Sequence, residues 1–393
     1  MSSSAAPQRD AESGTWWFIV DLGPGPGADG KWRARRQAKR RGFATKKDAQ
    51  AALDDLRVAA REQSYVTPTN QTIDEFLREW LDAASLTLEP STHESYVRNM
   101  RLHVSPRIGK LRLQQIDPST LNRLYAALVR DGRASGKGGL SPKTVRYIHT
   151  TLHAAFEAAV RWGRLNRNPA HGAEPPSARR ARNSVMRTWT AEEVSRFLAS
   201  AKRSRYRTVW LFLLTTGCRR GEALGLRWDD VDLDHSVVTL SQTITSVKGS
   251  IHRSGTTKTG KTRRIQLDAV TVDALRTWKA RQARERLAAG SHYADEGLVF
   301  CYSDGRPHHP NTFSWIFDDH IKRHGLPRIR LHDLRHTWAT LALEQGIHPK
   351  VVQERLGHSS VTVTLDIYSH VSPALESDAA ERIARLMTNG VVD

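Results

Sequence analysis

The sequence predicts a multidomain fold with a small α+β domain, an all-α middle domain, and a mainly-α third domain that carries a small antiparallel sheet. The chain has 393 residues, which suits two or three domains. Helix-capping sequences recur from Thr72 onward, and a Pro-rich basic stretch separates them from a further capped region. The predicted divisions are 1–13 (disordered), 14–65 (α+β), 66–71 (linker), 72–172 (helical), 173–187 (linker) and 188–393 (third domain).

The charge and composition of the chain indicate which kind of molecule it binds and which classes of protein it does not belong to. Lys and Arg total 60 against 41 Asp and Glu, a net charge of +19, which favours nucleic acid over an acidic membrane surface. No apolar run reaches the roughly 20 residues of a membrane helix, and the N-terminus lacks a signal peptide's apolar segment. The chain has two cysteines, Cys218 and Cys301, which are too few for a disulfide scaffold or a zinc site built from cysteines. This low number fits a reducing cytoplasm.

The α+β domain is predicted from one β-type run and one capped helix. The run begins at Thr15 and ends in a Gly/Pro turn at 23–27. Thr45 can cap a helix that continues to about Glu62.

A basic stretch lies inside this domain. Residues 31–47 hold nine Lys or Arg and no acid. Such a stretch is either a solvated charged face or a DNA contact, and the absence of acids favours DNA. The predicted contacts are Lys31, Arg33, Arg35, Arg36, Lys39, Arg40 and Arg41.

The middle domain is predicted from its helix starts. The tetrapeptides that begin at Thr72 and Ser91 fit the capping box. Asp117 and Ser141 each precede a Pro suited to a first helical turn, and helical apolar spacing follows. Predicted DNA contacts in this domain and the linker after it are Lys143, Arg146, Arg179, Arg180 and Arg182.

The third domain opens at a capping box on Thr190 and contains a glycine turn that presents arginine. An apolar helix runs into Gly217, which lets the chain turn, and the next helix is expected around Glu222. Arg219 on this turn can offer a planar fork of donors to a phosphate. The alternative is a structural pair between Arg219 and Glu222.

Three further segments carry candidate chemistry. A β-hairpin is predicted over 257–267, where Lys258 is either solvated or a mobile proton donor. His332 and Arg335 are spaced to share a face at a helix start. His358 follows a helix-ending glycine, and Tyr368 lies ten residues later.

In this order and spacing, the segments resemble the catalytic signature of tyrosine recombinases, the phage integrase family. That signature has Arg in a T-G-x-R-x-x-E turn, Lys in a hairpin, H-x-x-R, L-G-H, and Tyr about ten residues on. The matching residues are Arg219, Lys258, His332, Arg335, His358 and Tyr368. The helical region 72–172 is similar to the family's core-site-binding domain. The region 14–65 looks like the three-stranded sheet plus helix that reads arm sites in integrases of phages and integrative conjugative elements.

The resemblance implies a role for each group at the scissile phosphate. Arg219 and Arg335 stabilise charge that gathers on the non-bridging oxygens, and Glu222 fixes a neighbouring side chain. His332 is the candidate proton acceptor, expected to titrate near neutrality.

The remaining roles concern the nucleophile and the leaving group. Tyr368 attacks, His358 hydrogen-bonds a phosphate oxygen, and Lys258 protonates the departing 5′ oxygen. Lys261 is the alternative to Lys258, which fits better because the family's lysine lies just before the turn.

The resemblance also implies a reaction and an assembly. A covalent 3′-phosphotyrosine forms, a Holliday junction follows, and a mobile element is integrated, and in some members excised, without metal, ATP or another cofactor. The implied partners are double-stranded DNA at core and arm attachment sites, three further copies in a homotetramer, and an excisionase or DNA-bending factor. The implied location is the cytoplasm, at the nucleoid. The amphipathic tail at 379–387 docks either on a neighbouring copy or on its own domain.

Three alternatives stay open at this point. A metal-dependent phosphohydrolase would use His332, Asp333 and His336, although no further ligands stand at metal spacing. A non-catalytic DNA-binding regulator would use the same scaffold. A host-type chromosome-dimer resolvase normally lacks a domain like 14–65.

Overall fold

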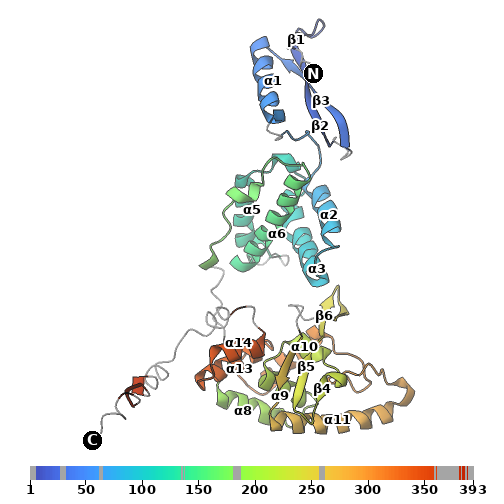
Figure 1. The fold of residues 1–393 in the computed structure, drawn as a ribbon, viewed down its shortest axis with the longest axis vertical. Coiled ribbons are helices and arrows are strands. Elements are labelled where there is room, and N and C mark those ends of the chain that lie inside the picture. The colour runs from blue at the N-terminus through green and yellow to red at the C-terminus, as the bar shows by residue number, and fades with distance from the viewer. Residues whose placement is uncertain are drawn as a thin grey trace. The chain divides into compact units, whose positions relative to one another are not determined.

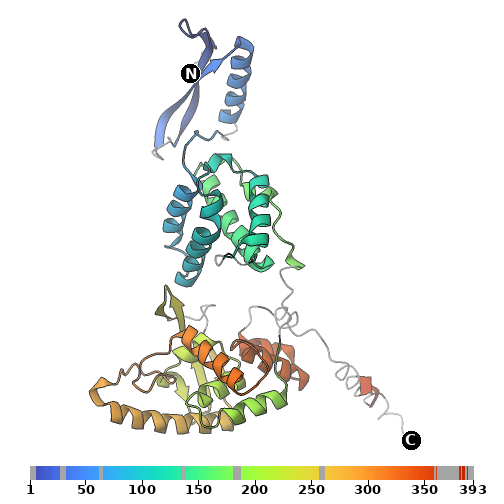
Figure 2. The ribbon, with the colours of Figure 1, turned by 180° about the vertical axis from the view of Figure 1, so that it is seen from behind.

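The computed structural model describes most of the chain. The described residues are 6–26, 32–61, 65–133, 136, 138–179, 187–255, 262–357, 360, 380–381, 383–385 and 387, without the side chains of 25–26 and 32–36. The chain divides into two compact units, Met1–Ser184 and Val185–Asp393. Figures 1 and 2 show the elements of both units from opposite sides. The finer division at the boundaries given above remains our proposal, except that the segment 1–13, expected to be disordered, contains a short strand at Gln8–Arg9 that pairs with Trp16 and Trp17.

The first unit opens with a three-stranded antiparallel sheet and one helix. Its elements are β1 (Gln8–Arg9), β2 (Trp16–Pro26), β3 (Trp32–Phe43) and α1 (Lys46–Arg61). The strands pair in sequence order, and α1 packs on β2. Because side chains alternate across a strand, Phe18, Val20 and Leu22 share one face and are buried with Leu53 of α1. The predicted α+β architecture is confirmed.

The rest of the first unit is helical. Its elements are α2 (Ile73–Ala84), α3 (Pro90–Asn99), the π-helix η1 (Met100–Val104), α4 (Ser105–Ile108), the 3₁₀ helix η2 (Leu113–Gln115), α5 (Pro118–Asp131), α6 (Pro142–Arg161) and the 3₁₀ helix η3 (Pro169–Gly172). The stripe Val145, Ile148, Leu152 and Phe156 is buried on α6, as its helical spacing predicts. The core of these helices is separate from the core under the N-terminal sheet.

Most of the predicted helix caps are confirmed. Each accepts a hydrogen bond from a backbone N–H in the first turn, which satisfies a donor that the helix leaves without a partner. The confirmed caps are Thr45, Thr72, Asp117, Ser141 and Thr190.

The capping box expected at Ser91 is wrong. Helix α3 begins one residue earlier, at Pro90, with Glu89 as its N-cap and no side-chain capping bond. Proline is favoured at the first helical position because its missing N–H would have no helical partner there. Ser91 therefore lies inside the first turn and cannot act as the cap.

The second unit contains seven α-helices among its described residues and two small sheets. The helical elements are α8 (Ala191–Ser200), α9 (Arg207–Thr216), α10 (Arg220–Gly225), η4 (Trp228–Asp230), α11 (Ala269–Ala289), η5 (Gly290–His292), α12 (Pro310–Arg323), α13 (Asp333–Glu344) and α14 (Pro349–Leu356). The strands are β4 (Val231–Asp232), β5 (Val237–Leu240), β6 (Thr243–Val247), β7 (Ser250–Ser254) and β8 (Arg263–Gln266). A mainly helical unit with small antiparallel sheets is what the sequence predicts.

Helix α9 forms the centre of the second unit. Seven of its ten residues are buried, and α11 and α13 both pack against it. Helix α14 packs on α13, and α10 packs on β6. These contacts bring the ends of α9, α10, α13 and α14 together.

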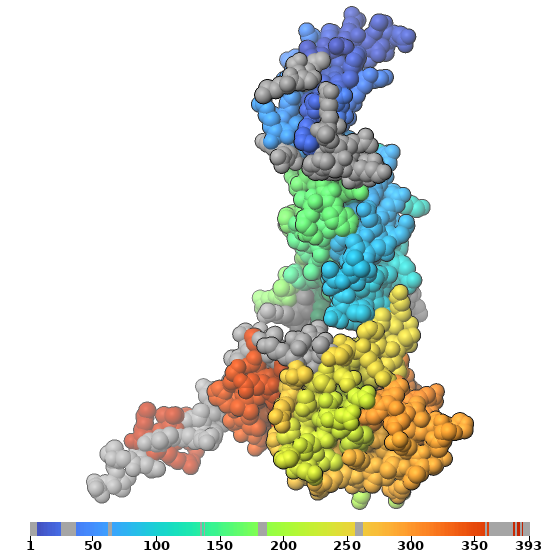
Figure 3. Space-filling view, turned by 45° about the vertical axis from the view of Figure 1, so that its right-hand side comes forward, coloured from blue at the N-terminus to red at the C-terminus, as the bar shows by residue number. Residues whose placement is uncertain are grey.

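The strand pairing differs from the predicted hairpin. Strand β8 pairs with β5, whereas β7 pairs with β6. Residues 256–261 lie outside the described part of the chain, so the turn at Gly260 is not tested. Figure 3 shows the β6–β7 hairpin as a yellow projection at the surface of its unit.

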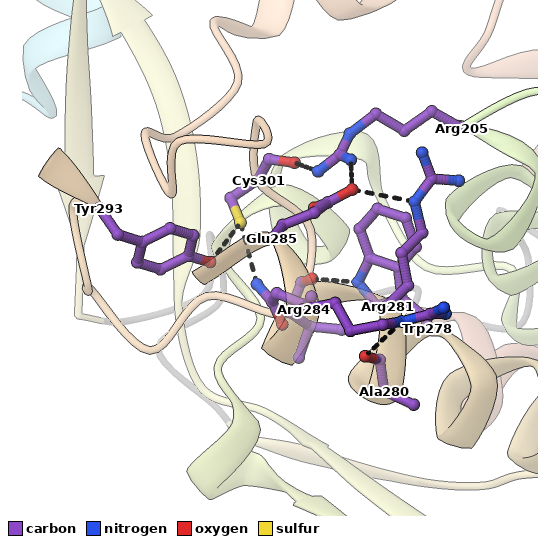
Figure 4. A network of polar contacts seen from close by, with 10 residues as sticks. Arg205, Trp278, Ala280, Arg281, Arg284, Glu285, Tyr293 and Cys301 are labelled. Atoms are coloured by element: carbon purple, nitrogen blue, oxygen red, sulfur yellow. Dashed lines mark hydrogen bonds and ion pairs between the residues drawn. The ribbon is translucent and has the colours of Figure 1, made fainter. Parts of the chain in front are cut away.

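A polar network anchors α11 to the loop after it (Figure 4). Glu285 accepts hydrogen bonds from Arg205 and Arg281, and Arg205 also donates to the carbonyl of Cys301 over 3.0 Å. The Trp278 indole donates to the carbonyl of Val299. These contacts join α11 to the segment before α9 and to the loop after η5, so the cluster has a structural role.

Among the helices described, none has the length and apolar character needed to cross a membrane.

Candidate active site

Arg219 is the N-cap residue of α10, and Glu222 in the first turn of that helix accepts hydrogen bonds from it. Its backbone N–H donates to Glu222 Oε2 over 2.8 Å, and its Nη1 donates to Oε1 over 2.7 Å. Helix α10 begins at Arg220, two residues before the position expected from the sequence. Arg219 is therefore the partner of Glu222, and its Nη2 also donates to the carbonyl of Gly357 over 3.2 Å.

Strand β8 brings a second guanidinium to the same carboxylate. Arg263 Nη2 donates to Glu222 Oε2 over 2.8 Å. Its side chain is 12% exposed and that of Glu222 is 2% exposed. Arg219 and Arg263, from different elements, thus share the buried carboxylate of Glu222.

The charge of Glu222 is maintained by these partners. Burial opposes its ionisation, but the charge of Arg263, the Arg219 N–H and the Arg219 guanidinium outweigh burial. The pKa of Glu222 therefore lies below its ordinary value, and the group is a carboxylate at neutral pH.

Arg335 is fixed by the glycine turn after α9. It is 3% exposed, and its Nη1 donates to the carbonyl of Gly217 over 2.9 Å. Gly217 has φ +63°, and a Cβ there would press on Leu356 and Trp338, so glycine is required. Burial, and then repulsion by Arg219, lowers the pKa of Arg335 to about 10, which leaves it cationic at neutral pH.

His332 lies directly before α13 with its ring against His336, at 5.1 Å between centroids. The protein around the ring, then the charges of His336 and Arg335, lowers the pKa of His332 to about 4. His332 is exposed to solvent, which moderates the shift. The imidazole is therefore neutral at pH 7 and can accept a proton. His332 was expected to titrate near neutrality, but its pKa lies lower than that.

Asp333 is committed to an ion pair. It is buried, and Arg330 donates to it from the backbone N–H over 2.8 Å and from Nη2 over 2.7 Å. Across the described ranges, no group of metal-ligating atoms includes His332, Asp333 and His336. The arrangement does not favour the metal-dependent phosphohydrolase.

Three predicted catalytic residues, Lys258, His358 and Tyr368, lie outside the described residues, as do Lys261 and all of 361–379. Their roles stay predictions. The structure brings Arg219, Glu222 and Arg335 together.

The predicted DNA contacts of the N-terminal sheet are described in part. Lys31 lies outside the described residues, and Arg33, Arg35 and Arg36 are on β3 with side chains that are not described. Lys39 and Arg41 are exposed, and the Lys39 ammonium lies 4.4 Å from the Trp17 ring centroid. Arg40 is half-buried and donates to the Tyr65 hydroxyl over 3.3 Å.

The predicted contacts in the helical region divide in the same way. Lys143 and Arg179 are exposed, whereas Arg180 and Arg182 are beyond the described ranges. Arg146 is half-buried and donates to the carbonyl of Pro176 over 2.9 Å. This bond holds the chain after η3 against α6, a structural role the sequence did not indicate.

Sequence reasoning missed Arg263. A signal was available, because Arg263 and the buried Ile265 are two residues apart in a strand and so share a face. That face points toward the core, where an arginine requires a partner.

Comparison with known proteins identifies matching families along the chain. The sequence profile of the Phage integrase family matches residues 187–374, that of the phage integrase N-terminal SAM-like domain matches 72–129, and that of the Arm DNA-binding domain matches 8–59. The ICEBs1 integrase of Bacillus subtilis is 26% identical over 96% of this chain and 99% of its own length. Tyrosine recombinase XerC of Mycobacterium tuberculosis is 30% identical over 65% of this chain and 82% of its own length.

Solved structures share the fold. The Tn1549 transposon integrase in complex with transposon right end DNA has a TM-score of 0.66 at 20% identity, covering 80% of this chain and 100% of that one. The lambda integrase tetramer bound to a Holliday junction has a TM-score of 0.57 at 17% identity, covering 92% and 98%. The profiles and the XerC relative show that the chain belongs to the phage integrase family of tyrosine-type site-specific recombinases, enzymes that break and rejoin DNA.

Proposed function

We propose that this protein is the integrase of a mobile element, and that it exchanges DNA strands through a covalent 3′-phosphotyrosine on Tyr368 and a Holliday junction. The match of residues 8–59 to an arm DNA-binding domain supports an integrase over a chromosome-dimer resolvase. The near full-length likeness to the ICEBs1 integrase supports an integrative element. The protein then acts at the nucleoid in the cytoplasm.

The observation that best supports this proposal is a group of arginines held in fixed positions. Glu222 holds Arg219 and Arg263, and Arg335 lies close enough to Arg219 for the two charges to repel. Three guanidinium groups around one carboxylate leave a net positive site. Such a site stabilises the negative charge that a phosphodiester gathers during attack, and it needs no metal to do so.

Proton transfer falls to His332 and Lys258. A neutral His332 accepts the proton of the Tyr368 phenol, whose ordinary pKa near 10 makes it a weak nucleophile without help. Lys258 then protonates the departing 5′ oxygen. His358 follows Gly357, whose carbonyl is bound by Arg219, so a role for His358 at the same phosphate is consistent with this contact.

Assembly on DNA is part of the proposal. The lambda integrase is a tetramer on its Holliday junction, and we infer four copies for this protein on core and arm sites. An apolar cavity of about 280 Å³ lies between α8, α9 and α13, lined by Leu198, Leu211 and Trp338 among others. Ile383 and Met387 of the tail are 52% and 72% exposed. We assign this cavity to the tail of a neighbouring copy.

The test is strand transfer between DNA fragments that flank the gene, in buffer without ATP. Tyr368→Phe is expected to bind these fragments with unchanged affinity but to give no cleavage and no covalent adduct. Tyr302→Phe is the matched control and is expected to cleave normally. Cleavage by Tyr368→Phe, or cleavage that yields free ends without a protein adduct at any stage, would contradict the proposal.

A further inference from the structure

A cluster of two histidines and a glutamate lies in the first unit, whereas the proposed catalytic residues all belong to the second unit. His153 and Glu157 are one helical turn apart on α6, and His171 is on η3. One ligand atom from each lies within 4.8 Å of the others. Within the described ranges, this is the group of three histidine, cysteine or carboxylate side chains whose ligand atoms lie close enough together to hold one metal ion.

The local contacts already orient these side chains. Glu157 Oε1 lies 2.9 Å from His171 Nε2 and accepts a hydrogen bond from Asn168 Nδ2 over 2.8 Å. The same Nδ2 donates to the carbonyl of His153 over 3.0 Å. Asn168 therefore fixes the carboxylate and ties η3 to α6, as outer groups do around a metal ligand.

The two imidazoles lie next to each other, with their planes tilted by 54°. The rings of His153 and His171 are 4.9 Å apart between centroids. Among the described residues, the ring nitrogens of His153 make no hydrogen bond to protein. His171 is 64% exposed and Glu157 33% exposed, so an ion can enter from solvent.

We propose that His153, Glu157 and His171 bind one divalent cation of the zinc class, with water in the fourth position. Zinc lies about 2.0–2.2 Å from such nitrogen and oxygen ligands, so small rotations of the exposed His171 ring complete the site. Two imidazoles with one carboxylate favour zinc, cobalt or nickel over magnesium or calcium, which prefer oxygen ligands.

The site is structural rather than catalytic. It joins η3 to α6 at the point where the helical elements end and the chain continues toward the second unit. Bound metal raises the melting temperature of the protein, because it binds the folded cluster and not the separated ligands.

The experiment uses the full chain, without a histidine tag and stripped of metal, titrated with Co²⁺ and then Zn²⁺. We expect one Co²⁺ per chain with the visible absorption of a low-symmetry site, displacement by Zn²⁺, no competition by Mg²⁺, and a higher melting temperature with Zn²⁺. Loss of a ligand in His171→Ala should weaken binding by more than the roughly 10–100-fold that outer-shell changes cost.

Two more variants make the test specific. Glu157→Gln keeps an oxygen for Asn168 but removes the charge, and it should also lose Co²⁺ binding. His235→Ala removes another imidazole that pairs with a carboxylate, Asp232 at 2.8 Å, and is expected to bind as the unchanged protein does. Retention of stoichiometric binding by His171→Ala or Glu157→Gln, loss of it in His235→Ala, or no saturable binding at all would overturn the proposal.

Discussion

Replacing Glu222 by glutamine tests how the arginines of the site are held. The carboxylate accepts from the Arg219 backbone over 2.8 Å, from Arg219 Nη1 over 2.7 Å and from Arg263 Nη2 over 2.8 Å. Glutamine has the same shape but carries one acceptor oxygen and no charge. At least one of the three donors is then left without a partner, and two guanidinium groups lose their counter-ion.

The magnitude follows from this burial. Removing one partner of a buried ion pair costs about 3–5 kcal/mol, which corresponds to a fall in melting temperature of roughly 6–20 °C for a unit of this size. Under the proposed mechanism Arg219 also loses its fixed position. Loss of one preorganised donor to a developing oxyanion slows a reaction about 10²–10³-fold, and we expect a similar loss in DNA cleavage.

The assay measures both effects in parallel. Calorimetry gives the melting temperature, and cleavage of a nicked attachment-site duplex gives the rate for each folded molecule. Glu285→Gln is the matched control, since Glu285 also pairs with two arginines, Arg205 and Arg281, but in the structural network on α11 (Figure 4). It should lower the melting temperature and leave the cleavage rate of folded protein within about twofold, as expected for a residue without a transition-state role.

Two results would refute this reasoning. A normal cleavage rate in folded Glu222→Gln would show that the carboxylate does not position the arginines for chemistry. An equal loss of rate in Glu285→Gln would show that the effect is one of general stability.

Three further predictions follow from other parts of the chain. His308 is buried, and burial and then the charge of Arg205 lower its pKa to about 4. The unfolded state therefore binds the proton at higher pH than the folded state does, so about 3 kcal/mol of stability is lost as pH falls from about 6.5 toward 4. Urea unfolding of His308→Asn should show a flatter dependence of stability on pH. Gly357→Ala introduces a Cβ at φ +67° that presses on the Arg263 guanidinium, so urea unfolding should show a loss of about 1–2 kcal/mol, and an unchanged midpoint would contradict it. Deleting 1–65 removes a sheet with its own core and should abolish regulated integration while core-site cleavage persists in a nicked-duplex assay; loss of core cleavage would count against the arm-site role.

Local features of the fold were predictable from the sequence. A cap such as Thr72 acts on the turn that follows it, so four residues contain the whole signal. Ser91 failed because the neighbouring Pro90 begins the helix one residue earlier. The β-type run that begins at Thr15 and the helix cap at Thr45 were enough to predict a small sheet with one helix.

Long-range features were not predictable from local pattern. Arg263 reaches Glu222 only because β8 pairs with β5 rather than with the strand before it, and this register is set by tertiary packing. The low pKa of His332 depends on the groups packed around the ring, including His336. Arg219 and Arg335 were recognised as candidate catalytic residues because their spacing matches that of a known family. The fold then brings the two arginines close to each other.

The most direct measurement is identification of the residue that becomes attached to DNA. The protein is trapped on a nicked attachment-site duplex whose released strand diffuses away, and the adduct is digested and mapped by mass spectrometry. We expect a single phosphodiester between the Tyr368 hydroxyl and a DNA 3′ end. An adduct on any other residue, or at a 5′ end, would contradict it.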